Sequence, residues 1–529
     1  MSKTATDRIL FLRAALSAHE NYWETLRPTM GLYRRAYLTR FWEGRKDVLD
    51  ESCIRVETSD GYATIESLMG SLFTKYPGVE ISPDPTGAGS VEVTKTLSNE
   101  FLSTVRAQVE AAARMALIYP QSFLKLAPRE SNSILGKVAL RAVPPWQVLL
   151  DRDASAYEDA RYVGHVYYLP VSDANEKFGR KKWVCEEQKD FFAPTDKKSA
   201  GYTKDTTELP EEYLYVRVVE MYDFQHDELL FWSPNWDSGK QLLSRDMIPC
   251  RTFDDRPLSN LVPFYFSRQP DRPMDGYSTM SRVYDQIHEK NVLRTFWANA
   301  VRRDSRQFLY RKDSLDPDQL AKVTAGQDGA MIEVDGDGSL DGMIALVPTG
   351  TLNTDHSAYL SYIEQDLQRG AMTAGFVRGE ASRATATEVS VLAQYTASEL
   401  GKMARDRDQT IEQAVLVYIR MLIPLVDDKQ KLVINTAAGA KVVTAESLDA
   451  DWTIYALDGG STPTTDVMRK QQLIQLVPTL MQLGVKTNDL KAELVRLYDL
   501  PEDFLKAVEA EAAPEAPPLP PVPSTDEVA

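Results

Sequence analysis

The feature that most constrains the fold is a long segment free of helix-breaking residues. From Ser278 to Tyr310 the chain contains neither proline nor glycine, and Gly276 and Ser278 supply a start signal for a helix. A helix of this length extends for about 50 Å, because each residue adds about 1.5 Å. Such a helix has more apolar surface than one small domain can cover, so we expect it to pack against further copies of the chain.

A second long helix is predicted over 386–426. Its apolar residues follow three- and four-residue steps, and Pro424 near its end is tolerable only as a terminator or a kink. Residues 402–409 are strongly charged, so we expect the middle of this helix to have more solvent or polar contact than its ends. A shorter helix is predicted over 354–373.

The chain before the first long helix combines helices with short strands. Helical patterns cover 4–41, 60–73 and 91–119. Short β-rich runs follow, bounded by proline, aspartate and glycine: SFLKLAP, KVALRAV, WQVLLD, RYVGHVYYLP and EYLYVRVVEMYDF. The polar span 175–209 interrupts these runs and is predicted to be an exposed excursion. Residues 1–275 are therefore expected to form one α+β region.

Two smaller regions also contain predicted strands. Residues 311–350 begin with a short helix and continue as strand, turn and strand. Farther on, KLVINT and KVVTA predict a β-hairpin, and helices are predicted over 465–483 and 487–498. The last segment, AAPEAPPLPPVPSTDEVA, is rich in proline and alanine, so a disordered, polyproline-like tail is expected. The predicted fold class is α+β, mainly helical.

Composition excludes several classes of protein. A chain of 529 residues is longer than one that usually folds around a single hydrophobic core, so at least two structural regions are expected. The net charge of −17 would repel DNA on average, which excludes a general DNA-coating role. Cys53, Cys185 and Cys250 lie far apart and predict neither a disulfide scaffold nor a structural zinc site. No apolar run is long enough to span a bilayer, and the N-terminal segment lacks a signal peptide's apolar core, so neither a membrane partner nor secretion is expected.

A search for catalytic motifs predicts no enzyme and no cofactor. Neither a GxxxxGK[ST] loop nor a GxSxG nucleophile elbow occurs. The five histidines never pair at a metal-ligand spacing, so they are interpreted as surface or packing residues. The segment DGDGSLDGMIAL resembles a calcium loop, but Leu340 and Leu346 stand where an EF-hand needs glycine and glutamate. Tight β-turns are the favoured interpretation, and no metal site is predicted.

The order of parts is more informative than any single motif. A long helix, a small α/β module, a return helix, a glycine-containing loop and a very long helix follow one another over 278–426. This order resembles the portal, or head-to-tail connector, proteins of tailed phages, most closely those of short-tailed phages (podovirus type). Three local sequences are similar to the family's approach to the stem, its wing and its junction of tunnel loop and long helix: VPFYFSRQPDRPMDGYSTMSRVYDQIHEKN, VPPWQVLLDRDASAYEDARYVGHVYYLP and GEASRATATEVSVLAQYTASELG. The resemblance covers roughly residues 4–426.

The resemblance implies a portal fold with wing, stem, clip and crown regions. The clip would face the packaging motor and later the tail, and the tunnel loop would lie at the narrowest point of a channel. In chain order the implied regions are the wing (1–277), the stem helix (278–310), the clip (311–353), the stem return helix (354–373), the tunnel loop (374–385), the long body helix (386–426), a crown-like region (427–510) and the tail (511–529).

The function implied by the resemblance is that of a structural conduit. Copies of the chain, twelve in the family, would form a ring at one capsid vertex of the virion after assembly in the host cytoplasm. The ring would conduct double-stranded DNA during packaging and ejection, dock the large terminase subunit, join a head-to-tail adaptor, and contact the major capsid and scaffolding proteins. The alternative is a non-channel structural or scaffolding virion protein, which would not need a clip module between two helices.

Candidate site residues follow from the same resemblance. Arg378 and Arg383 lie in the tunnel loop, where rings of arginine could touch DNA phosphates or form salt bridges between subunits. Arg302 and Arg306 on the stem helix could face either DNA or a neighbour's acidic residues, and salt bridges are the favoured interpretation. Clip residues could contact the terminase or the adaptor, with an ordinary solvated face as the alternative; they are Lys312, Asp313, Asp316, Asp318 and Lys322.

Overall fold

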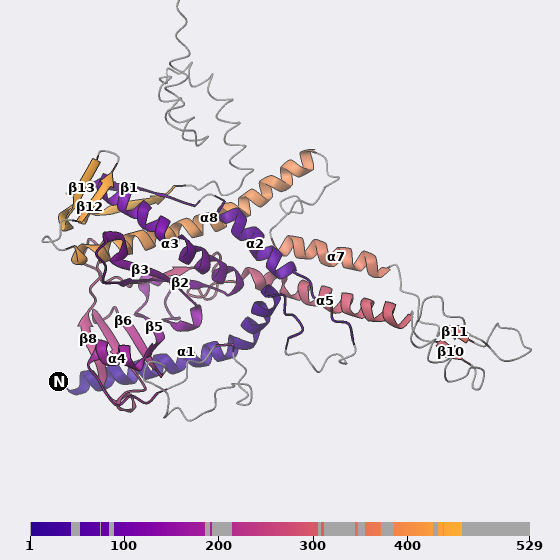
Figure 1. Ribbon diagram of the computed structural model, residues 1–529, viewed down its shortest axis with the longest axis horizontal. Coiled ribbons are helices and arrows are strands. Elements are labelled where there is room, and N and C mark those ends of the chain that lie inside the picture. The colour runs from indigo at the N-terminus through magenta and orange to yellow at the C-terminus, as the bar shows by residue number, and fades with distance from the viewer. Residues whose placement is uncertain are drawn as a thin grey trace, which may run out of the picture. The chain divides into compact units, whose positions relative to one another are not determined.

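The structure is a computed structural model that describes most of the chain up to Leu457. The described residues are 2–43, 53–74, 76–83, 89–185, 191–192, 214–304, 308–310, 344–346, 355–371, 386–426, 432–436 and 439–457. The chain divides into two compact units, Met1–Ser461 and Thr462–Ala529, and all described residues belong to the first, which is mixed α and β (Figure 1). This division falls inside the range 427–510. The helices predicted over 465–498 and the tail lie outside the described residues.

Four helices supply most of the main core. Their bounds are Ser2–Tyr37 for α1, Asp60–Leu72 for α2, Val91–Ile118 for α3 and Ala386–Leu422 for α8. All four lie within a few residues of their predicted bounds. α3 and α8 contact each other, and the rings of Phe101 and Tyr418 stack with their centroids 3.8 Å apart. Pro424 lies in a short 3-10 helix that follows α8 directly, so its predicted role as a terminator is confirmed.

The charged middle of α8 is more buried than its composition suggests. Met403, Arg407 and Thr410 are buried, and Arg407 is fully inaccessible to solvent. The Arg407 guanidinium pairs with Asp408 (Nη2 to Oδ1, 2.6 Å) and donates to the carbonyl oxygen of Leu72, the last residue of α2. The expected polar contact is confirmed at Arg407, and Lys402 and Arg405 in the same charged run are exposed, whereas Met403 and Arg407 lie on the helix face that packs into the core.

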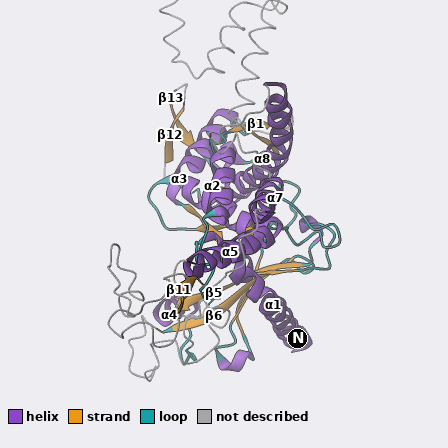
Figure 2. Ribbon diagram, turned by 90° about the vertical axis from the view of Figure 1, so that its right-hand side faces the viewer, coloured by secondary structure: helices purple, strands orange, loops and turns teal. Residues whose placement is uncertain are grey.

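Two antiparallel sheets lie next to the helical core. The three-stranded sheet has the order β3-β2-β9, with strands Val138–Val143, Ser122–Pro128 and Leu261–Phe264. The five-stranded sheet has the order β4-β5-β6-β7-β8, with strands Val148–Leu150, Tyr162–Pro170, Tyr215–Asp223, Glu228–Trp232 and Leu242–Met247. All five predicted β-rich runs contain a strand, so that prediction is confirmed. Figure 2 shows α2, α3 and α8 gathered together, apart from β5 and β6.

Helices cover both sheets. α3 and α8 contact the strands of the three-stranded sheet, and α1 packs its Leu12 and Leu16 against Val219 and Leu230 of the five-stranded sheet. Within the predicted excursion 175–209, residues 186–190 and 193–209 lie outside the described residues. α4 (Val171–Phe178) extends into its start, where Glu176 and Lys177 are exposed. That helix ends at Gly179, whose φ of 61° is left-handed and favours glycine.

The last described strands return to the first part of the chain. β1 (Val79–Pro83) pairs antiparallel with β14 (Trp452–Ala456), so strands more than three hundred and fifty residues apart form one small sheet. The predicted hairpin is confirmed as β12 (Leu432–Thr436) and β13 (Gly439–Val443), and a single-turn helix, α9 (Ala445–Leu448), leads into β14.

The long helix predicted over 278–310 is shorter than expected. α5 covers Thr279–Asp304, and Phe308–Tyr310 forms β10, which pairs antiparallel with β11 (Ile344–Leu346). The prediction is therefore wrong at its end, because pairing with a distant strand outweighs a sequence that contains no helix breaker. The return helix, α7, covers Asp355–Gly370 and lies beside α5 (Figure 1).

Candidate functional site

The helix pair α5 and α7 is the first candidate site, and its two helices run antiparallel. Gly370, the last residue of α7, packs against the backbone of Arg282 near the start of α5, where an added Cβ would lie 3.0 Å from the Arg282 carbonyl oxygen. Tyr359, near the start of α7, donates to Glu289 farther along α5. The pairing of β10 with β11 joins the chain after α5 to the chain before α7.

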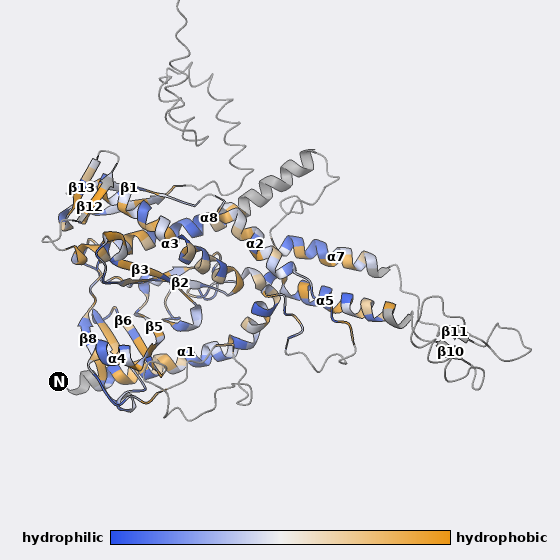
Figure 3. Ribbon diagram, viewed as in Figure 1, coloured by the Kyte–Doolittle hydropathy of each residue, from blue (hydrophilic) through white to orange (hydrophobic). Residues whose placement is uncertain are grey.

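The outer half of α5 has no apolar core within the described part of the chain. Beyond Ile287 its buried side chains are Lys290, Asn291, Thr295 and Asn299, all polar. Apolar side chains on the same pair of helices remain uncovered: Phe296 is 54% exposed and Tyr362 on α7 is 62% exposed. Figure 3 shows hydrophilic and hydrophobic residues alternating along both helices. Val301 on α5 and Tyr359 on α7 are exposed as well, so each helix carries two exposed apolar side chains, which is expected of a contact surface for another protein.

Three polar side chains of α5 bind the backbone of residues 54–58. Asn299 accepts from the Ile54 amide (2.9 Å) and donates to the Ile54 carbonyl (2.8 Å). Thr295 accepts from the amide of residue 56 (3.0 Å), and Asn291 accepts from the amide of residue 58 (2.8 Å). The spacings match, because four residues of a helix rise about 6 Å and two residues of an extended chain span about 6.6 Å. We call Asn291, Thr295 and Asn299 the polar ladder.

Replacing Asn299 by alanine is expected to release residues 54–58 from α5. Both backbone groups of Ile54 would lose their partner, and a typical intramolecular hydrogen bond contributes about 0.5–1.5 kcal/mol to stability. Hydrogen exchange should show faster exchange of peptides covering 54–58, while peptides covering β1 keep their rate. Arg294→Ala, on the exposed side of the same helix, is the control. Equal exchange in both variants would mean that the ladder does not hold this segment.

Most of the site residues predicted from the sequence lie outside the described residues. They are Arg378, Arg383, Arg306 and all five clip residues: Lys312, Asp313, Asp316, Asp318 and Lys322. Arg302 lies in the last turn of α5, and its side chain is not among those described. The contacts with DNA, terminase and adaptor therefore remain predictions, because the described side chains do not include the residues that would make them.

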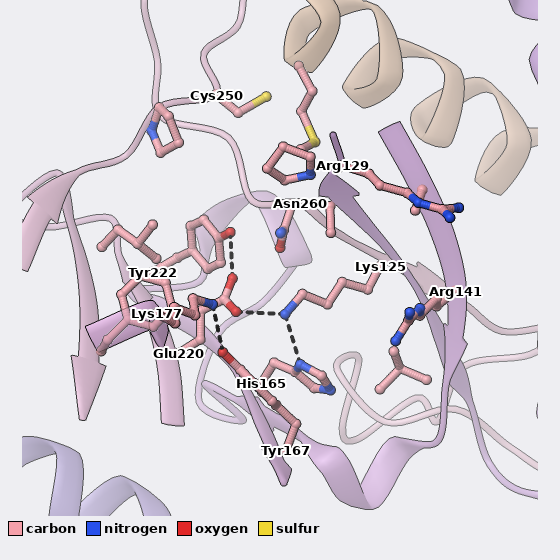
Figure 4. A pocket seen from close by; sticks show the side chains of 18 of the residues that line it. Lys125, Arg129, Arg141, His165, Tyr167, Lys177, Glu220, Tyr222, Cys250 and Asn260 are labelled. Carbon is pink, nitrogen blue, oxygen red and sulfur yellow. Dashed lines mark hydrogen bonds and ion pairs between the residues drawn. The ribbon is translucent and has the colours of Figure 1, made fainter. Parts of the chain in front are cut away.

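The second candidate site is a cavity of about 890 Å³ lined by both sheets and by the end of α8. Lys125 of β2 stands at its centre (Figure 4). The Lys125 ammonium pairs with Glu220 of β6 (2.6 Å) and donates to Nδ1 of His165 on β5 (2.9 Å). The other oxygen of Glu220 accepts from the hydroxyl of Tyr222 (3.0 Å). These groups form one connected polar network inside a largely apolar wall.

Burial fixes the protonation of several groups in the cavity wall. Burial, together with the adjacent Lys125 cation, holds the pKa of His165 well below its usual value, so the ring is neutral. Burial also raises the pKa of Tyr222 well above its usual value and the pKa of the Cys250 thiol to about 12. These three groups keep one protonation state around neutral pH.

The sequence reasoning missed this cavity, although one signal for it exists. Lys125 stands two residues after Phe123 in a predicted strand, so both side chains lie on one face of the sheet, and a charge at an inward position is unusual. Glu220 likewise lies within an apolar strand and is only 5% exposed. The interpretation of His165 as a packing residue agrees with its burial.

Searches for other kinds of site give negative results over the described ranges. No group of three or more histidine, cysteine, aspartate or glutamate side chains in them could hold a metal ion. No helix in the same part of the chain is long and apolar enough to cross a membrane. Comparison with protein-family models gives no match, and comparison with curated proteins gives no significant match.

Proposed function

We propose that this chain is the subunit of a DNA-conducting ring, a portal protein of the head-to-tail connector type. The ring conducts double-stranded DNA into the capsid during packaging and out of it during ejection. It also docks the large terminase subunit and later joins the head to the tail. The observation that carries the proposal is the antiparallel pair α5 and α7, on which Phe296 and Tyr362 are exposed.

Ring closure supplies the contacts that these helices lack. Identical subunits that meet through two different surfaces form a closed ring when the rotation between neighbours closes. Each helix pair then packs its aromatic side chains against the next subunit, which removes their apolar area from water. The net charge of −17 is compatible with a conduit, since an acidic wall lets DNA pass without strong retention.

The purified full-length chain is expected to form rings with a central hole wide enough for duplex DNA. Mass photometry should give a high multiple of the 59.5 kDa subunit mass, and negative-stain images should show the hole. Phe296→Glu should raise the protein concentration needed for assembly by about thirtyfold, because a buried aromatic anchor typically contributes at least about 2 kcal/mol to an interface.

The matched control is Met247→Glu at the end of β8, where the side chain is 69% exposed and lies off the helix pair. This variant should assemble like the unmodified chain. A monomer at tens of micromolar concentration would end the proposal. Particles without a hole would favour the non-channel structural or scaffolding alternative, and equal assembly of both variants would remove the helix pair from the interface.

A further inference from the structure

The cavity around Lys125 has a charge opposite to that of the whole chain. Its lining includes four cationic side chains, those of Lys125, Arg129, Arg141 and Lys177, but only one carboxylate, that of Glu220. The chain as a whole carries a net charge of −17. Cations gathered in a concave site of an acidic protein focus a positive potential there, and that potential attracts anions.

Two of these cations oppose each other on neighbouring strands. The register of β2 and β3 places Lys125 directly across from Arg141, and like charges in this position destabilise a sheet. Glu220 compensates Lys125 at 2.6 Å. Arg141 is exposed and makes no side-chain hydrogen bond or ion pair with the described residues, and the same holds for Arg129. The three-stranded sheet therefore places two positive charges, those of Lys125 and Arg141, at the cavity, and only the Glu220 carboxylate compensates them.

The wall also contains polar atoms that its own groups do not satisfy. An ammonium group can only donate hydrogen bonds, so Nδ1 of His165 must accept from Lys125. The hydrogen of the neutral ring is therefore on Nε2. That Nε2 and Oδ1 of Asn260 are both buried without a hydrogen bond among the described residues. The two residues are 8% and 6% exposed, respectively. Buried polar atoms of this kind can bind a ligand or a water molecule that enters the cavity.

The rest of the lining is apolar and aromatic. Tyr167, Tyr168 and Phe231 line the cavity together with Leu229 and Pro424. Its volume of about 890 Å³ lies in the range of small-molecule sites, which are mostly apolar with a few convergent polar groups. Figure 4 shows Arg129 and Arg141 on one side of the cavity, and Lys177 and Tyr222 on the other.

We propose that this cavity binds a small organic phosphate. Arg129 and Arg141 hold the phosphate group, because guanidinium groups match phosphate oxygens in a two-pronged geometry. The ligand also carries an aromatic group, which packs against the apolar and aromatic part of the lining. The Lys125–Glu220 pair holds the floor of the site in place. None of the residues that bind the ligand belongs to the helix pair α5 and α7.

Three probes test the proposal on the purified full-length chain: adenosine monophosphate, adenosine and inorganic phosphate. Titration calorimetry should show binding of adenosine monophosphate that weakens as salt increases, because the attraction is screened. Adenosine and inorganic phosphate should each bind at least about tenfold more weakly, since each lacks one of the two recognised parts. If adenosine bound as tightly as adenosine monophosphate, recognition of the phosphate group would be overturned. If inorganic phosphate bound as tightly as adenosine monophosphate, recognition of the aromatic group would be overturned. Absence of binding by all three would overturn the proposal.

Arg141→Met supplies the residue-level test. Loss of a charge-assisted hydrogen bond should weaken binding of adenosine monophosphate by about tenfold or more. Lys240→Met removes one exposed cation away from the cavity and is the control, with binding unchanged. Without ligand, Arg141→Met should melt no lower than the unmodified chain, because it removes one of two like charges that face each other across the sheet, and Lys240→Met should melt at the same temperature as the unmodified chain. These melting temperatures separate lost binding from lost folding. Equal losses in the two variants would contradict a specific site.

Discussion

Replacing Gly276 by alanine is expected to lower the free energy of unfolding of the unit Met1–Ser461 by about 3 kcal/mol. An ideal Cβ at this position would overlap the carbonyl oxygen of Pro120 and lie 2.7 Å from its carbonyl carbon, so backbone must move. Gly276 also donates its amide to Gln121 (3.0 Å), and Ser278, two residues later, donates to the carbonyl of Ile118 (2.7 Å). The start of α5 is thereby fixed to the end of α3.

The melting temperature measures this loss. For a unit of this length 3 kcal/mol corresponds to a decrease on the order of 3 °C, because the entropy of unfolding is about 2.1 cal/mol/K per residue. Gly401→Ala is the control: nothing lies within 4 Å of its added Cβ, and alanine in a helix is favoured over glycine by about 0.8–1 kcal/mol. If the Gly276→Ala protein melted at the temperature of the unmodified chain, the backbone at Gly276 and Pro120 would be able to move apart at little cost in free energy.

Replacing Arg407 by alanine is expected to cost about 3 kcal/mol as well, for a different reason. Breaking a buried ion pair leaves its partner poorly solvated, here the carboxylate of Asp408, and deletion of a large buried side chain opens a cavity. The carbonyl oxygen of Leu72 also loses its cationic donor at the negative end of the α2 dipole. Chemical denaturation should show a lower midpoint.

Two further variants separate these causes. Arg407→Met keeps most of the volume and should recover part of the loss, because only the ionic contribution is then missing. Arg405→Ala removes an exposed arginine two residues away on the same helix and should change the free energy of unfolding by less than about 0.5 kcal/mol. If Arg405→Ala and Arg407→Ala had equal effects, burial of Arg407 would have no energetic consequence.

The sequence predicted individual elements better than their partners. The run SFLKLAP forms β2 with both predicted ends, because its alternation and its closing proline are local signals. The pairing of β1 with β14 has no such signal, since two five-residue strands gain their stability only when distant segments meet. The same reason explains β10, which a helical pattern concealed.

The candidate sites were predictable to different degrees. α5 and α7 lie antiparallel, in the order of long helix, small module and return helix that the sequence predicts. The cavity was not predicted, because its charged residues come from separate strands that only the register brings together. The charged run 402–409 predicts solvent or polar contact but not the burial of Arg407, since a charged stretch of helix does not indicate which turn faces the core.

The small sheet of β1 and β14 cannot form until most of the chain has been synthesised. Ribosomes add about 5–20 residues per second, so roughly 20 to 75 seconds pass between synthesis of the first strand and synthesis of the second. During that interval the nascent chain carries an unpaired strand edge beside the apolar side of α3, a surface prone to aggregation. A chaperone that shields the growing chain would therefore be most useful before translation reaches Ala456. Chains truncated before Ala456 lack a complete β14, so release from the chaperone should help them to fold the least.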